Sequence, residues 1–118
     1  MNATCSPADH SSRFKPLPSD QEIERAARMG AAMGEPGRLR ILAFLLEGSR
    51  CVSELTAETG DSLSLVSQRL KVLAAARLLN RRREGKHVYY RLADEHVRVL
   101  VENLLSHAND HHQTELED

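Results

Sequence analysis

The chain has 118 residues, a formal net charge of −1 and 3% aromatic residues, with no tryptophan. This length gives one small domain, whose core must come from aliphatic side chains. No apolar run approaches the roughly 20 residues of a membrane span and no signal-peptide segment is recognisable, so we expect a cytoplasmic protein without a membrane partner. In that compartment the two cysteines, Cys5 and Cys51, fit thiols or metal ligands better than a disulfide.

The near-neutral net charge conceals an asymmetry along the chain. Residues 36–92 carry eleven Lys or Arg against five Asp or Glu, whereas residues 93–118 carry one against seven. A basic middle segment in a neutral protein indicates an anionic partner for that segment. The acidic end either repels DNA or attracts cations.

The first part of the chain shows the start and stop signals of successive helices. Residues 1–19, which hold Ser, Pro and scattered charge, are expected to form a flexible N-terminal arm. Ser19 or Asp20 is a suitable helix N-cap. Pro36 suits a first helical turn, and Gly60 suits a helix end. The predicted helices cover about residues 20–33, 36–47, 52–59 and 62–76.

Two of these helices, joined by Gly60-Asp61, predict a helix-turn-helix. The turn glycine adopts a left-handed conformation without steric cost, and Asp61 or Ser62 caps the second helix. The residues that we expect to face inward from this second helix are Leu63, Val66, Leu70 and Leu73. The opposite face then presents Ser64, Ser67, Gln68 and Lys71. Such side chains reach base edges and phosphates, so this helix is expected to read DNA.

A β-hairpin is predicted directly after the helix-turn-helix. Residues 79–84 and 87–92 read as strands, and Gly85-Lys86 between them has glycine first, as a type II′ turn requires. The hairpin is basic and suits contact with phosphates or the minor groove. The residues expected at DNA are therefore Ser62, Ser64, Ser67, Gln68, Lys71, Arg81, Arg82, Arg83 and Lys86. We see no nucleophile–base pair on the polar faces, which argues against an enzyme.

The last helix carries metal-ligand residue types at both ends. Its apolar residues Val97, Leu100, Val101, Leu104 and Leu105 form one helical stripe. Asp94 and His96 precede this stripe, and His107 and Asp110 follow it. The two histidines are eleven positions apart, which is roughly 16 Å along a helix and too far for one ion. If two copies pair antiparallel, both pairs meet, which predicts a homodimer with two metal sites across its interface. The alternative is that these residues are solvated helix ends.

Together these predictions give a mainly α fold with a β-hairpin, in which residues 20–107 form the domain and residues 108–118 a polar tail rich in His and acidic residues. His111 and His112 in this tail are either extra ligands or part of a disordered end. Extra ligands enlarge the coordination toward six, which favours nickel or cobalt over tetrahedral zinc.

The chain resembles the ArsR/SmtB family of dimeric winged-helix repressors that sense metals. The likeness covers roughly residues 20–112 and is carried by EPGRLRILAFL, by CVSELTAETGDSLSLVSQRLKVL and by EGKHVYYRLAD. The resemblance implies a winged helix-turn-helix that dimerises through its first and last helices. It also implies that the metal-free dimer binds double-stranded operator DNA, that Zn(II) releases it, and that an efflux or sequestration gene is then expressed.

The resemblance also implies specific metal ligands. The family's C-terminal helix site joins an Asp-x-His pair of one subunit to a His-x-x-His or His-x-x-acid pair of the other, and Asp94, His96, His107 and Asp110 match it. His107 would donate its second ring N–H to a backbone carbonyl near Arg77 and so couple the metal site to the DNA-reading helix.

A second metal site of some family members joins the N-terminal arm to the start of the helix-turn-helix. The matching residues are Cys51 and Glu54, with Cys5 and either Asp9 or His10 from the arm. Ser53 stands where sensors of soft ions carry a second cysteine, which argues against arsenite and favours zinc or cobalt. The alternatives are a small hydrophobic role for Cys51, a nickel or cobalt sensor, and a winged-helix regulator without a metal role.

Overall fold

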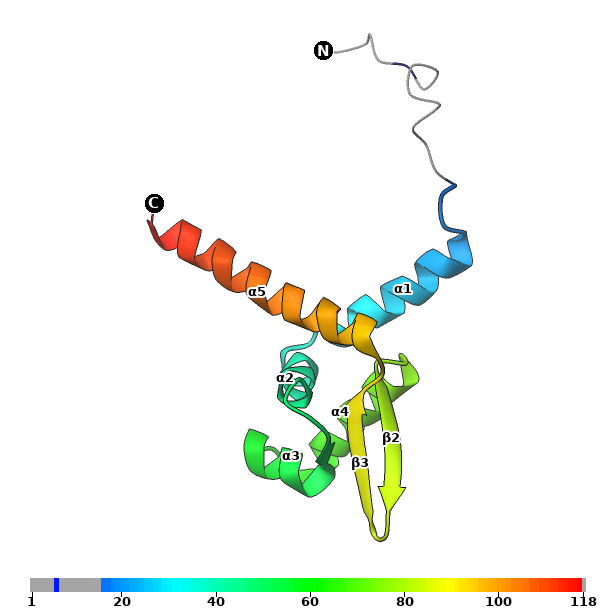
Figure 1. Cartoon of the computed structure of the whole chain (residues 1–118), viewed down its shortest axis with the longest axis vertical. Coiled ribbons are helices and arrows are strands. Elements are labelled where there is room, and N and C mark those ends of the chain that lie inside the picture. The colour runs from blue at the N-terminus through cyan, green and yellow to red at the C-terminus, as the bar shows by residue number, and fades with distance from the viewer. Residues whose placement is uncertain (1–5, 7–15, 118) are drawn as a thin grey trace.

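The computed structural model describes residue 6 and residues 16–117, with side chains described as far as residue 110. The described elements are α1 (Asp20–Met33), α2 (Pro36–Leu45), β1 (Arg50–Cys51), α3 (Val52–Thr59), α4 (Leu63–Ala75), β2 (Leu79–Glu84), β3 (His87–Leu92) and α5 (Glu95–Glu117). As Figure 1 shows, α1 and α5 diverge at one end of the molecule, while α3 and the β2–β3 hairpin form the other end. This is the predicted winged helix-turn-helix. Within the described residues no helix is long and apolar enough to cross a membrane.

The helix starts follow from their capping residues. Ser19 caps α1 through a capping box, in which its Oγ accepts the Glu22 N–H at 3.1 Å and its own N–H donates to the Glu22 carboxylate at 2.9 Å. Pro36 is the first residue of α2, as predicted. The end of α2 was predicted too late, because the helix stops at Leu45 and Leu46 is its C-cap.

The core lies between the C-terminal end of α1, the helices α2, α3 and α4, the base of the hairpin and the first turns of α5. Its fully buried large side chains are Ile41, Leu42, Leu45, Leu55, Val66, Leu70, Leu73, Leu78 and Val101. One predicted core residue is wrong, because Leu63 is 62% exposed. It is the first residue of α4, where the helix has not yet reached the core that buries Val66 and Leu70 on later turns. Hydrophobic periodicity shows which face of a helix is apolar, but it does not show which turns of that helix contact the core.

The predicted hairpin is confirmed residue by residue. Glu84 pairs with His87 across the two-residue turn, and Gly85 has the positive φ of 62° that such a turn demands at its first position. The short strand β1 was not predicted, because its two residues carry no periodic pattern. It adds to the free edge of β3, with Cys51 opposite Tyr89, and so attaches the middle of β3 to the start of α3.

The long helix α5 divides the predicted apolar stripe into two faces. Val97 and Val101 are buried and Leu105 packs against the same core. Leu100 and Leu104 remain 49% and 43% exposed. The helix also continues to Glu117, through the segment 108–117 that we expected as a polar tail. One face of α5 therefore belongs to the chain's own core, and the other faces outward.

Two arginines join the helices at their C-terminal ends. Arg98 on α5 donates from Nη1 to the carbonyl oxygen of Leu46 at 2.9 Å, and Arg38 on α2 donates from Nε to the carbonyl oxygen of Ala32 at 2.7 Å. The last carbonyl groups of a helix lack partners within the helix and carry partial negative charge, which a guanidinium satisfies. Arg98 thus attaches α5 to α2, and Arg38 attaches α2 to α1.

Candidate nucleic-acid interface and metal centre

The outer face of α4 presents most of the residues predicted to read DNA. Ser64, Gln68 and Lys71 are exposed, and Ser67 is half-buried. Ser62 lies at the N-cap, where its Oγ accepts the Leu65 N–H at 3.1 Å. Its hydroxyl is therefore committed to starting the helix, and the helix presents a row of hydroxyl, amide and ammonium groups beyond it.

An ion-pair network holds α4 in place, and sequence reasoning missed its central residue. Arg69 donates from Nη1 to the Asp61 carboxylate at 2.8 Å, and its Nε lies 3.5 Å from Glu35 Oε1. Asp61 belongs to the turn of the helix-turn-helix, and Glu35 caps α2. Gly37 leaves the room for this contact, because a Cβ atom there would overlap the Arg69 guanidinium. No periodic or motif signal marks Arg69, since its partners lie on other elements.

Glu35 is an anion fixed by backbone donors. The N–H groups of Gly37 and Arg38 donate to its carboxylate at 3.0 and 2.9 Å. These two bonds, ahead of the charges of Arg69 and Arg38 and against the opposing effect of burial, hold the pKa of Glu35 below its ordinary value. The ionised carboxylate therefore both caps α2 and pairs with Arg69.

The arginines of the hairpin do not share one face. Arg81 lies opposite Tyr90 and Arg83 opposite Val88, whereas Arg82 lies opposite Tyr89. Because side chains alternate along a strand, Arg82 points away from the face of Arg81 and Arg83. Arg82 also pairs with Glu84 on the surface. The three arginines and Lys86 are exposed, so the hairpin is basic on both faces.

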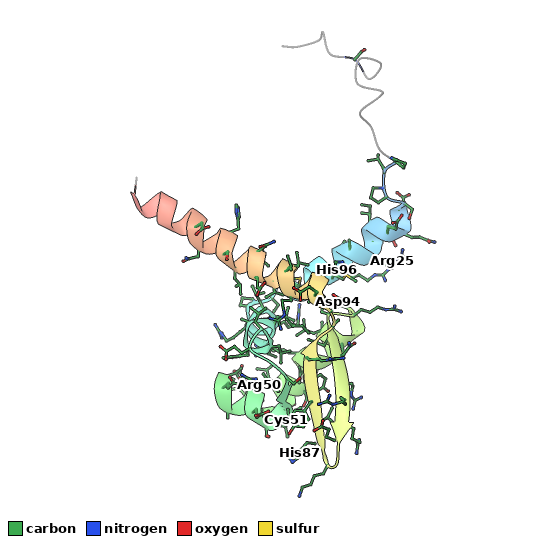
Figure 2. The ribbon with its side chains drawn as sticks, viewed as in Figure 1. Arg25, Arg50, Cys51, His87, Asp94 and His96 are labelled. Carbon is green, nitrogen blue, oxygen red and sulfur yellow. The ribbon has the colours of Figure 1, made fainter. Side chains whose placement is uncertain are left out.

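Asp94 and His96 lie together at the start of α5, near the centre of the view in Figure 2. Asp94 Oδ1 accepts the Val97 N–H at 3.0 Å, which caps the helix, and His96 Nδ1 is 3.9 Å from the same oxygen. Both side chains are largely exposed. Carboxylate oxygen and imidazole nitrogen suit zinc and its neighbours among the divalent metals. This pair supplies two donors on one turn of backbone.

The other predicted pair lies farther along the same helix. His107 and Asp110 are exposed, and residue 107 follows residue 96 by roughly 16 Å of straight helix. Among the described residues, no group of three or more His, Cys, Asp or Glu side chains is placed to hold a metal ion. One chain thus carries two donor pairs and does not bring them together.

An apolar groove of about 760 Å³ runs between α1 and α5. Its lining residues include Ala26, Met29, Gly30, Met33, Leu39, Leu100, Leu104, Leu105 and Ala108. Leu100 and Leu104, the exposed half of the α5 stripe, belong to this lining. The groove therefore lies between the helices through which we predicted dimerisation, along the part of α5 that follows the first donor pair.

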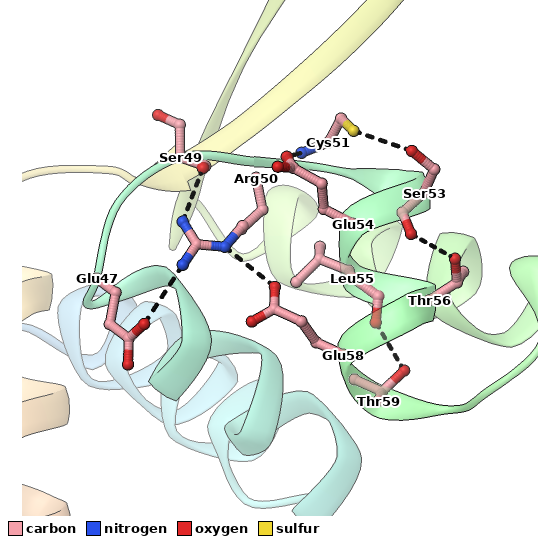
Figure 3. Close-up of polar contacts among 10 residues, drawn as sticks. All are labelled: Glu47, Ser49, Arg50, Cys51, Ser53, Glu54, Leu55, Thr56, Glu58 and Thr59. Atoms are coloured by element: carbon pink, nitrogen blue, oxygen red, sulfur yellow. Dashed lines mark hydrogen bonds and ion pairs between the residues drawn. The ribbon is translucent and has the colours of Figure 1, made fainter.

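The cysteine predicted for a second metal site is buried at the start of α3. Cys51 Sγ lies 3.1 Å from Ser53 Oγ, and the Cys51 N–H donates to the Glu54 carboxylate at 2.8 Å (Figure 3). That N–H is the main cause holding the pKa of Glu54 below its ordinary value, followed by the Cys51 side chain, with smaller contributions from the charges of Arg50 and His87. Cys5, Asp9 and His10, the predicted arm ligands, lie outside the described residues.

Arg77 follows α4 and its C-cap Ala76 in a left-handed conformation, with a φ of 64°. The following N–H, that of Leu78, donates to the carbonyl oxygen of Leu73 at 3.0 Å, which closes α4 in the manner of a Schellman motif. The Ala93 N–H then donates to the Leu78 carbonyl oxygen at 3.0 Å. Backbone bonds therefore connect the end of α4 to the start of α5, next to Asp94.

Comparison with known proteins places this arrangement in a family. Residues 35–81 match the family described as "Bacterial regulatory protein, arsR family". The chain is 38% identical to the HTH-type transcriptional repressor SmtB of Mycobacterium tuberculosis over 96 residues, which are 80% of this chain and 71% of that repressor. It is 33% identical to a cadmium resistance transcriptional regulatory protein, a CadC homologue of Staphylococcus aureus, over 86% of this chain and 85% of that one.

A solved structure shows the same fold. The homodimeric winged helix-turn-helix DNA-binding domain Mb0332 from Mycobacterium bovis superimposes with a TM-score of 0.75 at 34% identity, over 82% of this chain and 93% of that one.

Proposed function

The chain belongs to the arsR family of DNA-binding transcriptional regulators, and from this premise we propose that it is a zinc-responsive repressor: its metal-free dimer binds operator DNA, and zinc binding between the subunits releases the DNA. One observation carries this proposal. The two donor pairs of α5 are separated along a helix whose outward apolar face is left open in the single chain.

The DNA-reading part of the proposal rests on α4 and the hairpin. Ser64, Ser67 and Gln68 supply hydrogen-bonding groups for base edges, and Lys71 supplies a cation for a phosphate. The basic hairpin supplies further phosphate contacts, which make binding depend on salt concentration. Two such surfaces in a symmetric dimer suit a palindromic operator.

The dimer part rests on the groove between α1 and α5. Leu100 and Leu104 face outward in the single chain, and an apolar surface of this kind on a small domain favours association. An antiparallel pairing of two α5 helices covers it in both copies, because a two-fold axis uses the same patch twice. The comparison with a homodimeric domain of the same fold supports a dimer, and the pairing through α5 is our proposal.

The metal part follows from that pairing. Asp94 and His96 of one protomer would hold an ion together with His107 and Asp110 of its partner, twice in each dimer. When bound, zinc supplies a tetrahedral centre for four oxygen or nitrogen donors. Asp94 caps α5 through Oδ1, which leaves Oδ2 to face an ion. Holding both ends of each α5 in this way fixes the relative position of the two helices.

The signal then reaches α4 through contacts within each chain. The start of α5 is bonded to the end of α4 through Ala93 and Leu78, and α5 is attached to α2 through Arg98. A fixed α5 pair thereby favours one arrangement of the two α4 helices. The zinc-bound dimer must disfavour DNA by a coupling free energy of roughly 1–3 kcal/mol or more, and DNA must weaken zinc binding by the same amount.

A complementation experiment tests the intersubunit site. One variant carries Asp94→Ala and His96→Ala, and the other carries His107→Ala and Asp110→Ala. Each homodimer lacks half of both sites, whereas a heterodimer of the two variants keeps one complete site. Cobalt is the probe, because its absorption spectrum reports tetrahedral coordination.

The expected result is no tetrahedral cobalt in either variant alone and about one ion per heterodimer after mixing. A His87→Ala control, which changes a strand residue, should bind cobalt as the unaltered protein does. Full binding by either variant alone would contradict the site, and so would a mixture that binds no better than its components.

A six-coordinate nickel or cobalt sensor is the second candidate. The observation that favours it is the continuation of α5 to Glu117, which places residue 111 one helical turn after His107. Deleting the chain from His111 onward distinguishes the two proposals. If Asp94, His96, His107 and Asp110 are the whole ligand set, the truncated protein binds metal as the full chain does. If His111 or His112 is a ligand, the truncated protein loses the octahedral nickel spectrum.

A further inference from the structure

Leu63 is an apolar side chain where the DNA-reading helix is otherwise polar. It is the first residue of α4 and is 62% exposed, the most exposed large hydrophobic residue on that helix. It belongs neither to the core cluster nor to the lining of the groove between α1 and α5. Neither folding nor the proposed dimer interface accounts for a leucine at this position.

Leu63 lies at the border between the buried stripe of α4 and the proposed base-reading face. It precedes the buried Val66 by three residues and Ser67 by four. Leu63, Ser67 and Lys71 follow one another at intervals of four residues and so form one row along α4. Ser64 and Gln68 lie beside that row, by the same spacing. Because a helical Cα–Cβ bond tilts toward the N-terminus, the Leu63 side chain extends beyond the first turn. In a helix-turn-helix this end of the second helix contacts base edges.

Leu65 provides an internal comparison. It is the same residue type on the same turn and is 36% exposed. At roughly 100° per residue it points about 160° away from Leu63, on the other side of the helix from Ser67 and Lys71. Of these two exposed leucines, only Leu63 lies in the row of Ser67 and Lys71, whereas Leu65 lies beside Gln68, three residues farther along.

The major groove has one apolar feature, the C5-methyl group of thymine, and aliphatic contact with it distinguishes thymine from cytosine. We propose that Leu63 is a specificity-determining residue that packs against a thymine methyl group in each half of the operator. This inference rests on the proposed function for the orientation of α4 on DNA, and it is independent of the metal site.

The test removes methyl groups from DNA one at a time. An operator is first selected from random duplexes with the full-length protein. Each thymine is then replaced in both half-sites by deoxyuridine, which lacks only the methyl group, and affinity is measured by fluorescence anisotropy at fixed salt. At one symmetric position we expect a loss of about fourfold for each half-site, the effect of one buried methyl group.

The protein variants assign that effect to a residue. Leu63→Ala should bind the natural operator more weakly and should be indifferent to deoxyuridine at that position. Leu63→Met, which keeps an apolar contact, should retain the sensitivity, and Leu65→Ala should retain it in full. Thermal unfolding checks that each variant folds, as expected for exposed positions.

Several outcomes would overturn the inference. One is that the unaltered protein loses no affinity on deoxyuridine substitution at any position. Another is that Leu63→Ala remains sensitive at the same thymine, and a third is that Leu65→Ala loses this sensitivity as well. A protein that selects no DNA sequence at all would instead overturn the proposed DNA-reading function, and with it the orientation on which this inference depends.

Discussion

The two ends of the molecule differ in whether a single chain supplies all the partners that the side chains there need. Around α3, α4 and the hairpin, polar partners are satisfied within the chain, as by Arg69 with Asp61 and Glu35. Around α1 and α5, a 760 Å³ apolar groove is open and the two donor pairs are apart. The proposed DNA-reading region is therefore complete in a single chain, whereas the proposed sensing region is complete only in a dimer. A ligand at such an interface changes DNA affinity only through the contacts that connect the two regions, which are the Ala93–Leu78 and Arg98–Leu46 hydrogen bonds.

The largest expected effect comes from placing charges in the open groove between α1 and α5. Leu100→Glu with Leu104→Glu places carboxylates in the proposed interface of both copies. We expect the dimer to weaken at least about a hundredfold, because each unpaired charge must lose water on association. Sedimentation over a range of concentrations measures it. Val99→Glu is the matched control, since Val99 is 42% exposed and lies outside the groove lining. Equal dimerisation of both variants would contradict the interface.

A second change disturbs the ion-pair network of Arg69, at the end of the molecule where polar partners are satisfied within the chain. Gly37→Ala displaces the Arg69 guanidinium, and we expect a loss of about 1–2 kcal/mol in the free energy of unfolding as its partners lose their bonds. In an Arg69→Ala background the same substitution should be neutral or stabilising, because alanine favours a helix over glycine. Denaturant unfolding of the four proteins gives the interaction energy. An additive cycle would mean that Gly37 and Arg69 do not act together.

A third change tests a joint between the two regions. Arg98→Met removes the bond from α5 to the Leu46 carbonyl oxygen. We expect a stability loss of about 1 kcal/mol, reduced by partial exposure of the side chain, and a smaller effect of zinc on DNA affinity. Arg98→Lys should recover part of both. Arg28→Met is the control, because the Arg28 pair with Glu24 lies on the surface. An unchanged zinc effect in Arg98→Met would assign the coupling to the Ala93–Leu78 connection alone.

The smallest expected effect is a pH dependence of the caps. Backbone N–H donors hold the pKa values of Glu22, Glu35 and Glu54 below the ordinary value of 4.5. A lowered pKa in the folded state contributes stability above the ordinary value, and this is lost as the pH falls through the lowered value. The melting temperature should therefore drop as the pH falls below about 4.5 and through the lowered pKa values. Replacing all three by Gln should flatten that drop, and an equally steep curve would contradict the assignment.

Local signals predicted the elements well, and tertiary contacts escaped prediction. Ser19, Pro36, Gly60 and Gly85 each act within a few residues, and each marks a boundary that the structure confirms. Arg98 donates to a carbonyl group 52 positions away, so the residues next to it in the sequence give no sign of this contact.

The DNA-reading and sensing residues differ in the same way. The row of hydroxyl and amide groups on α4 was visible in the sequence, but the exposure of Leu63 depends on where the core ends. The assembly of Asp94 and His96 with His107 and Asp110 stays a prediction, because it depends on how two copies meet.

The central claim is that zinc binding between subunits releases DNA. The most direct measurement titrates Zn²⁺ into the metal-free dimer bound to a fluorescent operator, at fixed salt and protein concentration. The account predicts loss of anisotropy that is complete at about two ions per dimer, and recovery when a chelator is added. Tight DNA binding that zinc, cobalt and nickel all leave unchanged would contradict it.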